Sequence, residues 1–559
     1  MYILQNAHWF IILIGALIFF HELGHFLVAK ACDVKVLRFA LGFGPKLFSY
    51  EKGETQYQLR ALPLGGYVKM LGEIPGEDEE IAPEDEGRSF DAKPIWQRAA
   101  IAFAGPAFNL ILALIVYFFM FSGTHQFGAT KLGIVSKGQP AWQAGLRPGD
   151  TIRAVNGEET EHWEQLRQVI ATNPGKDLQI DYERHGQIHT GTLRPEAHSR
   201  ENVFKEQETK GRIGISLQYL KPIVAVIDET SPAALAGIET GDQILSINKS
   251  DINAWHEVRQ LFAGLSAQSN IELSLKRGEQ EISKELVPVD FPQELKNDAF
   301  SSADSLFYTG LINMDTIIDE VEEGSPAAKA GLLKNDRLLS VAIENEDGIS
   351  PATPIGVWAI DLSAFQGSDA RARFHLSYQR GMEIKETQVQ LEAREETDDF
   401  KNKRTVYRFG AHNNNTVLDT YLLERQVSLG EAFYEANLQV LEDMSLIIKG
   451  IAKIVQGVIP LDTMGGPIML FVIAEKSAKR GWDFFFRMFA MISVNLGILN
   501  LFPLPVLDGG QLMFLAYEAI RRRPPPMRFR ELANVFGLGM LLLLMVLVFH
   551  NDIIRYVLG

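Results

Sequence analysis

The sequence element that decides the fold spans residues 9–25 and reads WFIILIGALIFFHELGH. Its first twelve residues are all apolar or glycine, which is typical of a helix that crosses a bilayer. Two histidines and a glutamate follow within five residues, and such side chains inside a span are costly unless they serve a function. Residues 1–8 contain no Lys or Arg, so the basic start of a signal peptide is missing. We therefore predict a retained first span that carries a chemical site.

Three further stretches are long and apolar enough to cross a membrane. Residues 99–123 and 488–507 contain no charged residue, and residues 532–550 surround a run of Leu and Met. Each holds roughly the 20 mostly apolar residues that a spanning helix needs. The sequence therefore predicts a multi-pass α-helical membrane protein with four transmembrane helices.

The basic residues beside these spans set the expected orientation, because positively charged loops stay in the cytoplasm. Seven Lys and Arg residues lie between Lys30 and Lys69, and five lie between Arg521 and Arg530. With four spans, both chain ends and residues 124–481 then lie on the opposite side of the membrane. We expect a large exported region held by four helices.

The exported region contains one pattern three times, around Pro140, Pro232 and Pro326. Each copy has Ser or Gln before the proline, a short alanine-containing stretch, a glycine, and then Gly-Asp or Asn-Asp. Proline favours the first turn of a helix and glycine favours its end. These units resemble PDZ domains of the bacterial protease type, which implies three tandem β/α modules. PDZ domains bind extended peptides by strand addition, so peptide capture and a purely steric packing role both stay open.

The HELGH stretch predicts a metal site. His21 and His25 lie one helical turn apart, so both rings face one point, and neutral imidazole nitrogens suit zinc. Glu22 between them is placed to act as a general base toward water. The metzincin extension of this motif would put glycine at Val28 and histidine at Ala31, so that class is excluded.

A zinc hydrolase needs a third protein ligand, and the sequence offers two sources. Asp508 is the other acid at membrane depth, and it follows Pro503 and Pro505, which unwind the end of the third span. Glu51 and Glu54 are nearer in sequence but lie in a polar segment outside the span. We favour Asp508, and an alternative site in the cytosol would use Glu51 or Glu54.

Together these motifs resemble the site-2 protease family of intramembrane zinc metalloproteases. Residues 20–26 match the first motif of the family, and residues 500–510 match its second, the Asn-Pro-Asp-Gly motif. Residues 105–109 resemble its Gly-Pro-Asn feature in the second span, and residues 62–69 resemble the end of its membrane-associated β-loop. The likeness covers nearly the whole chain. It departs from the close relatives in one respect, because they carry two PDZ domains where this chain has three units.

The resemblance assigns roles to individual residues. It implies one Zn²⁺ held by His21, His25 and Asp508, with Glu22 as the catalytic base. It also implies a set of substrate-binding residues, which are Gly65, Gly66, Tyr67, Asn109, Asn500, Pro503 and Pro505.

The resemblance further implies an intramembrane endopeptidase of regulated intramembrane proteolysis. Its substrates would be single-span membrane proteins such as anti-sigma factors, which receive the second, site-2 cut, and remnant signal peptides. We expect an inner-membrane protein with both termini in the periplasm and the active site near the cytoplasmic side. The alternative is a non-catalytic membrane adaptor whose PDZ-like array binds periplasmic peptides. The formal charge of −16 argues against a nucleic-acid partner, and the single Cys32 excludes an intrachain disulfide.

The predicted segments follow one another along the chain. They are the first span with the metal motif (1–30), a cytoplasmic segment with the β-loop (31–97), the second span (98–123), three PDZ-like units (124–221, 222–300 and 301–396), amphipathic helices with a periplasmic linker (397–481), the third span (482–510), a cytoplasmic loop (511–531) and the fourth span (532–551). The large size of the exported region predicts that this region acts as a size filter. It would admit only membrane stubs whose exported domain has been removed.

Overall fold

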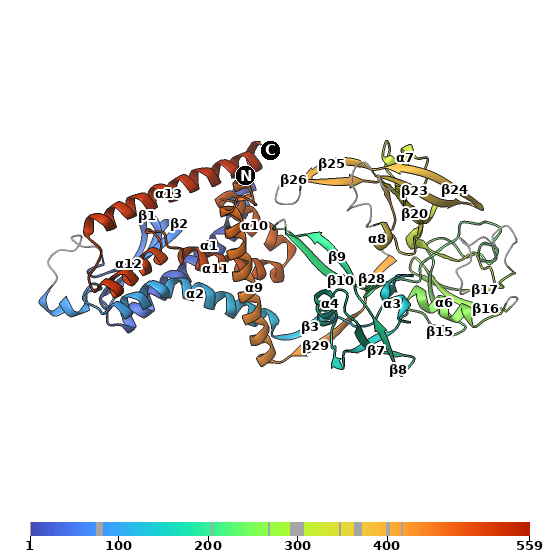
Figure 1. Ribbon diagram of the computed structural model, residues 1–559, viewed down its shortest axis with the longest axis horizontal. Helices are drawn as coiled ribbons and strands as arrows, with labels where there is room; N and C mark the ends of the chain where they lie inside the picture. Colours follow the sequence, from blue (N-terminus) through green and yellow to red (C-terminus); the bar gives the residue numbers. More distant parts are fainter. Residues whose placement is uncertain are drawn as a thin grey trace.

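The computed structural model describes residues 2–73, 82–202, 204, 206–266, 269–290, 307–345, 348–362, 372–397, 403–414 and 417–558. The chain forms a bundle of long helices at one end and an array of strands and short helices at the other (Figure 1). The long helices are α1 (Tyr2–Ala31), α2 (Ile95–Phe121), α9 (Leu429–Val455), α10 (Pro467–Arg480), α11 (Trp482–Asn500), α12 (Asp508–Arg521) and α13 (Met527–Ile553), which continues as η7 (Ile554–Leu558).

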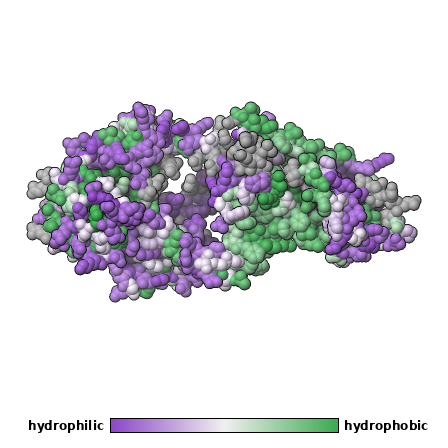
Figure 2. Space-filling model, turned by 180° about the vertical axis from the view of Figure 1, so that it is seen from behind, coloured by the Kyte–Doolittle hydropathy of each residue, from purple (hydrophilic) through white to green (hydrophobic). Residues whose placement is uncertain are grey.

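Four helices among the described residues are long and apolar enough to cross a membrane. They are His8–Ala31, Ile95–Phe121, Trp482–Asn500 and Met527–Leu558. Apolar surface covers the middle of the helical part, and polar surface borders it on both sides (Figure 2). Such a belt suits a bilayer core between two aqueous phases. The predicted multi-pass architecture with four spans is therefore confirmed.

The third span differs from its expected bounds of 482–510. Helix α11 ends at Asn500, residues 501–507 are not helical, and α12 begins at Asp508 and runs through part of the expected loop 511–531. Pro503 and Pro505 lack the amide donors that a continuous helix needs in this stretch. Gly509 and Gly510 then let α12 restart against the carbonyls of residues 501–504, because a Cβ at either glycine would lie 2.1–2.2 Å from a backbone oxygen.

Two long strands follow α1, namely β1 (Val36–Lys52) and β2 (Thr55–Met70). Both bend, so the first part of β1 lies between the two halves of β2, and Arg38 is paired with both Gln56 and Lys69. The last part of β2, residues 66–70, is therefore an edge strand. No third strand joins this sheet in the described part of the chain. One face packs on α1 through a core of buried apolar residues that includes Phe39, Val68 and Met70.

Three units make up the array, and each folds around its own hydrophobic core. Their sheets share one strand order, which is β6-β5-β7-β8, β15-β14-β16-β17 and β21-β20-β23-β24. The first unit contains β4 (Ile134–Val135), α3 (Pro140–Gln143), β5 (Thr151–Val155), β6 (Glu158–Glu159), α4 (Trp163–Thr172), β7 (Leu178–Arg184), β8 (Gln187–Leu193), β9 (Glu196–Glu201), β10 (Gln207–Arg212), β11 (Ile215–Ser216) and β12 (Gln218–Leu220). The second contains β13 (Val224–Ala225), α5 (Pro232–Leu235), β14 (Gln243–Ile247), β15 (Ser250–Asp251), α6 (Trp255–Ala263), β16 (Ile271–Arg277), β17 (Gln280–Leu286) and β18 (Ile312–Asn313).

The third unit repeats this plan with longer strands and follows a short turn, η3 (Met314–Thr316). It contains β19 (Glu320–Val321), α7 (Pro326–Lys329), β20 (Arg337–Asn345), β21 (Gly348–Ile349), β22 (Thr353–Pro354), α8 (Trp358–Asp361), β23 (Arg373–Arg380), β24 (Glu383–Gln390), β25 (Glu392–Thr397), β26 (Lys403–Arg408) and β27 (Ala411–His412).

A late strand of each unit returns to pair with its first, β11 with β4, β18 with β13 and β27 with β19. The second unit therefore continues past the expected end at residue 300, and Phe307 belongs to its core. The third continues past residue 396 for the same reason. The expected boundary at residues 300 and 301 itself lies outside the described residues.

One buried ion pair recurs in all three units. The aspartate of each Gly-Asp or Asn-Asp turn is 1% exposed and accepts two hydrogen bonds from the arginine that ends the third sheet strand. The same arginine also donates to the carbonyl of the glycine that ends the preceding short helix. The pairs are Asp150–Arg184, Asp242–Arg277 and Asp336–Arg380, each with an Nη2–Oδ2 distance of 2.7 Å. The repeated sequence pattern thus encodes the same ion pair and the same backbone hydrogen bond in all three units.

The chain returns to the bundle beside the point where it left. After the third unit, β28 (Leu418–Thr420) pairs with β12, and β29 (Leu422–Val427) pairs with β3 (Gly123–Gly128). The amide of Lys221 donates to the carbonyl of Val417 over 2.7 Å, so the second and third units are inserted between two adjacent points. Helix α9 follows and runs across the spans rather than along them, and both chain ends lie near it on the side of the array (Figure 1).

Candidate metal centre and active site

Two helices bring together three side chains that can hold a metal. The Nε2 atoms of His21 and His25 on α1 lie 3.2 Å apart. Asp508, the first residue of α12, places Oδ2 3.2 Å from His21 Nε2 and Oδ1 3.5 Å from His25 Nε2. No other His, Cys, Asp or Glu trio of this closeness is found among the described residues. Ligand atoms about 2.0–2.1 Å from a tetrahedral zinc ion are about 3.4 Å from one another, so the spacing fits zinc.

The ring of His25 is oriented by α2. Its Nδ1 lies 2.8 Å from the carbonyl oxygen of Ile101, so Nδ1 carries the proton and donates it. The lone pair of Nε2 then points at the centre, as in metal sites where a second hydrogen bond fixes the tautomer. The contact with Ile101 could not be predicted from the sequence, because a backbone carbonyl has no residue-type signature.

Asn109 on α2 supports the same arrangement at His21. Asn109 is fully buried, and its amide nitrogen lies 3.1 Å from Nδ1 of His21, whereas its Oδ1 has no hydrogen-bond partner. Turning this amide by 180° gives the buried oxygen the Nδ1 proton of His21. That single change satisfies Asn109 and frees Nε2 of His21 to bind a metal. The orphaned oxygen is therefore explained by a metal-binding histidine pair.

Two glycines let α1 and α2 approach closely enough to form the centre. A Cβ at Gly105 of α2 would lie 2.3 Å from Nε2 of His25, and a Cβ at Gly24 of α1 would lie 2.4 Å from the carbonyl oxygen of Ala104. Any side chain at these positions would push the helices apart. Gly24 lies inside the predicted metal motif, but the sequence does not show that its role is close packing.

The expected substrate-binding residues are divided among several positions. The Asn500 amide nitrogen lies 3.4 Å from Nδ1 of His21, at the end of α11. Gly66 on the edge strand lies against Glu22, since a Cβ there would be 2.9 Å from Glu22 Cγ. Gly65 has a φ of +125° and packs under the ring of Phe43.

The other three expected residues lie in different surroundings. The Tyr67 hydroxyl accepts hydrogen bonds from Arg60 and Arg38 on the opposite face of the strand from Gly66. Pro505 packs against Gly537 of α13, and Pro503 is exposed.

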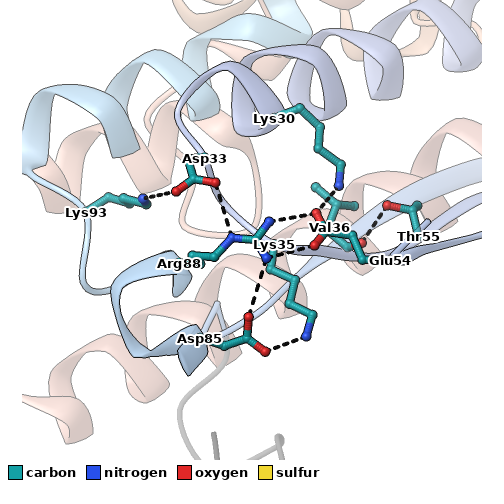
Figure 3. Close-up of polar contacts among 9 residues, drawn as sticks. All are labelled: Lys30, Asp33, Lys35, Val36, Glu54, Thr55, Asp85, Arg88 and Lys93. Carbon is teal, nitrogen blue, oxygen red and sulfur yellow. Dashed lines mark hydrogen bonds and ion pairs between the residues drawn. The ribbon is translucent and has the colours of Figure 1, made fainter. Parts of the chain in front are cut away.

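The structure places the alternative ligands elsewhere. Glu54 accepts from Lys30 and from Arg88, which is one residue of a charged network at the far end of α1 (Figure 3). Arg88 and then Lys30 lower the pKa of Glu54 to about 2. Glu51 accepts from Gln56 and is exposed. Neither belongs to the trio of ligand atoms.

The model of peptidase family M50 matches residues 9–544 of the chain. The chain belongs to this family. Protease RseP of Yersinia pestis is 28% identical over 99% of this chain and 100% of its own length. The regulator of sigma-E protease RseP of Salmonella typhimurium is 28% identical over 99% of both chains. A relative in Pasteurella multocida, named as a zinc metalloprotease, is 29% identical over 98% of both.

Family membership fixes the kind of enzyme. The protein is a zinc metalloendopeptidase embedded in a membrane. The two histidines, Asp508 and the orphaned oxygen of Asn109 all fit a zinc ion held between α1 and α12.

Proposed function

We propose that the protein cuts single-span membrane proteins inside the bilayer, with His21, His25 and Asp508 as zinc ligands. The observation that carries this proposal is the position of His21 and His25 on a helix apolar enough to span a membrane, with Asp508 a short non-helical stretch beyond the end of another such helix, α11. A bound zinc ion acts as a Lewis acid that polarises water and the scissile carbonyl. Glu22 takes the proton of the attacking water and later delivers it to the leaving amine.

The edge strand of β2 is the proposed substrate platform. A transmembrane helix must unwind before cleavage, because its carbonyls are hydrogen-bonded and shielded. Residues 66–70 pair with β1 on one side only, so their other side can add an extended segment. Gly66 brings that edge directly to Glu22. Asn500, beside His21, is suited to donate to the substrate carbonyl.

The test of the reaction is Glu22→Gln. This variant should keep one zinc per chain and lose cleavage of a single-span substrate by roughly 10²- to 10⁴-fold, because only the proton carrier is removed. Glu164→Gln, an exposed residue of α4, is the matched control and should cleave like the wild type. Wild-type turnover by Glu22→Gln would exclude this mechanism, and wild-type protein without zinc would favour the adaptor.

For the substrate we propose membrane-anchored anti-sigma factors after a first cut, as well as remnant signal peptides, in the inner membrane. The names of the relatives in Yersinia pestis and Salmonella typhimurium support regulation of a sigma factor. The basic residues beside the spans, and the chain ends on the side of the array, support a periplasmic array and periplasmic termini. The metal motif then lies toward the cytoplasmic side.

For the array we propose three PDZ-like units that act chiefly as a size filter. Their shared strand order, their separate cores and the repeated Asp-Arg pair support three copies of one module. A folded exported domain cannot pass packed units without displacing them, whereas a short tail can thread through at modest entropic cost.

The adjacent ends of the insertion allow a clean test of the filter. Residues 222–416 can be removed and Lys221 joined to Val417 by a short linker, because these two residues are hydrogen-bonded. The ratio of untrimmed to trimmed substrate cleavage should rise toward one. Removing only residues 315–413 should give a smaller rise, and its ends are also close, since Asn413 donates to the carbonyl of Asp315 over 2.9 Å. An unchanged ratio in both deletions would favour peptide binding instead.

A further inference from the structure

A charged network lies at the end of α1 that follows the metal motif. It joins α1 and its exit, both β strands, the turn η1 (Pro83–Arg88) and the approach to α2 (Figure 3). Its charged members are Lys30, Asp33, Lys35, Glu54, Asp85, Arg88 and Lys93. The catalytic chemistry uses none of them.

Arg88 is the hub of this network. Its two terminal nitrogens each lie 2.8 Å from one oxygen of Glu54, which is the paired geometry that arginine forms with a carboxylate. Its Nε lies 3.2 Å from Asp33, and Nη1 lies 3.4 Å from Asp85. Lys30 adds a second cation to Glu54 at 2.5 Å. Single exposed ion pairs contribute little, but this arginine bridges three carboxylates from separate segments.

Backbone hydrogen bonds join the same segments. The amide of Lys35 donates to the carbonyl of Arg88 over 3.0 Å, and the amide of Leu71 donates to that of Lys35 over 3.0 Å. The hydroxyl of Thr55 donates to the carbonyl of Val36 over 2.7 Å. The start of β1, both ends of β2 and the turn η1 therefore form one hydrogen-bonded layer at the end of α1.

This layer holds the sheet at one position along the axis of α1. Helix α1 is continuous from Glu22 to Lys30, a rise of about 12 Å. At the Lys30 end the network holds the sheet, and at the Glu22 end the edge strand meets the helix through Gly66. The network and the catalytic base thus contact the same sheet at two ends of one continuous stretch of helix.

We propose that Arg88, through its pair with Glu54, is a positioning residue that selects the scissile bond by fixing the edge strand of β2 against Glu22. The proposal rests on the proposed function, in which the substrate adds to this edge. Strand residues are spaced by about 3.3 Å, so a small slip of the sheet presents a neighbouring peptide bond and the other side-chain face.

Three variants test this role in the full-length enzyme with a single-span substrate. Arg88→Ala and Glu54→Gln should each keep one zinc per chain, lower kcat/KM roughly 10- to 100-fold, and add products cut one or two bonds away, measured by mass spectrometry. The double variant should be no worse than the more affected single variant, because the Arg88–Glu54 pair is already lost in each single variant. Arg88→Lys keeps the positive charge but lacks the planar guanidinium that forms two hydrogen bonds with one carboxylate. It should therefore restore part of the wild-type preference for one cleavage site.

A second readout does not depend on cleavage. Hydrogen exchange of residues 36–41 and 66–70 should speed up in Arg88→Ala and in Glu54→Gln. Arg194→Ala is the matched control, because Arg194 forms a similar two-point pair with Asp177 on the array surface and should change neither exchange in the sheet nor the products.

The outcomes separate the two proposals. An enzyme whose products and sheet exchange are the same in Arg88→Ala, Glu54→Gln and wild type overturns the role of Arg88 and leaves the reaction mechanism intact. Faster sheet exchange with an unchanged cleavage site also overturns it, because the network would then be structural only. A failure of the proposed function appears instead as wild-type protein that binds no zinc or cuts no membrane substrate.

Discussion

The bundle and the array bury their carboxylates in different ways. In the array, Asp242 is 1% exposed and has a complete set of partners, which are Arg277 and the amide of Glu239. In the bundle, Asp508 meets only the two histidines, and no Lys or Arg pairs with it in the described part of the chain. The first carboxylate is neutralised by the protein, and the second needs a cation from outside.

This difference separates structural from functional charge. A buried charge with all its hydrogen bonds satisfied holds a turn in place, whereas a buried charge with free lone pairs is suited to bind a metal. Removing the carboxylate should therefore lower local stability at a structural site and metal binding at a functional site.

The largest expected effect is at Asp508. Asp508→Ala should remove stoichiometric zinc and lower cleavage by at least about 10³-fold, because a ligand is lost from a three-ligand site. Metal analysis of purified protein and cleavage of a single-span substrate measure both. In the presence of a chelator, the variant and the wild type should unfold alike, since only the metal distinguishes them. Zinc retained by Asp508→Ala would return Glu51 or Glu54 to consideration.

The reverse result is expected at Asp242. Asp242→Ala should destabilise the second unit by about 2–4 kcal/mol, because it removes the two-point pair with Arg277, which keeps only Glu239 and the carbonyl of Gly237, and leaves the amide of Glu239 without its acceptor. Zinc content and cleavage of trimmed substrate should stay at wild-type levels. Hydrogen exchange of β14 and β16 measures the local loss.

The matched control for Asp242 is an exposed pair in the first unit. Asp177 and Arg194 are 59% and 64% exposed, so Asp177→Ala should leave the stability of the first unit close to that of the wild type. Equal losses at Asp242 and Asp177 would mean that burial does not decide the role of these carboxylates.

Local patterns in the sequence predict much of the molecule. Four apolar runs gave the four spans, and one repeated proline-glycine-aspartate pattern gave three units. The HELGH motif and Asp508 predicted the metal ligands, and the structure brings these side chains together. Each of these signals is a residue type that physical chemistry ties to one environment, such as an apolar run or an acid at membrane depth.

Contacts between distant segments were not predictable in the same way. The arginine of each Asp-Arg pair follows its aspartate by 34, 35 or 44 residues, and no local pattern joins the two. The return of β28 to β12 depends on backbone hydrogen bonds that any sequence can form. The close approach at Gly105 depends on which helix packs against α2, which the sequence of α2 alone does not determine.

The smallest expected effect concerns Asp315, a third kind of buried carboxylate. It is fully buried in η3, between the second and third units, and accepts from the amide of Trp358 and the side chain of Asn413. No Lys or Arg pairs with it among the described residues, and burial raises its pKa to about 6. Between about pH 4 and pH 6, folding therefore takes up a proton at Asp315. The stability that protonated Asp315 contributes is complete below about pH 4 and is lost as the pH rises through about 6.

The third unit should consequently be more stable at pH 5 than at pH 7.5, by about 1–2 kcal/mol. Hydrogen exchange of β20, corrected for the intrinsic pH dependence of exchange, measures this difference in the intact enzyme. Asp315→Asn keeps the shape of the side chain without the charge and should remove the dependence. The Gly-Asp turn of the second unit is the internal control: Asp242 is paired with Arg277, so β14 should show no loss of protection over the same interval. A pH dependence that persists in Asp315→Asn would assign it to another group and would remove the distinction between paired and unpaired carboxylates in the array.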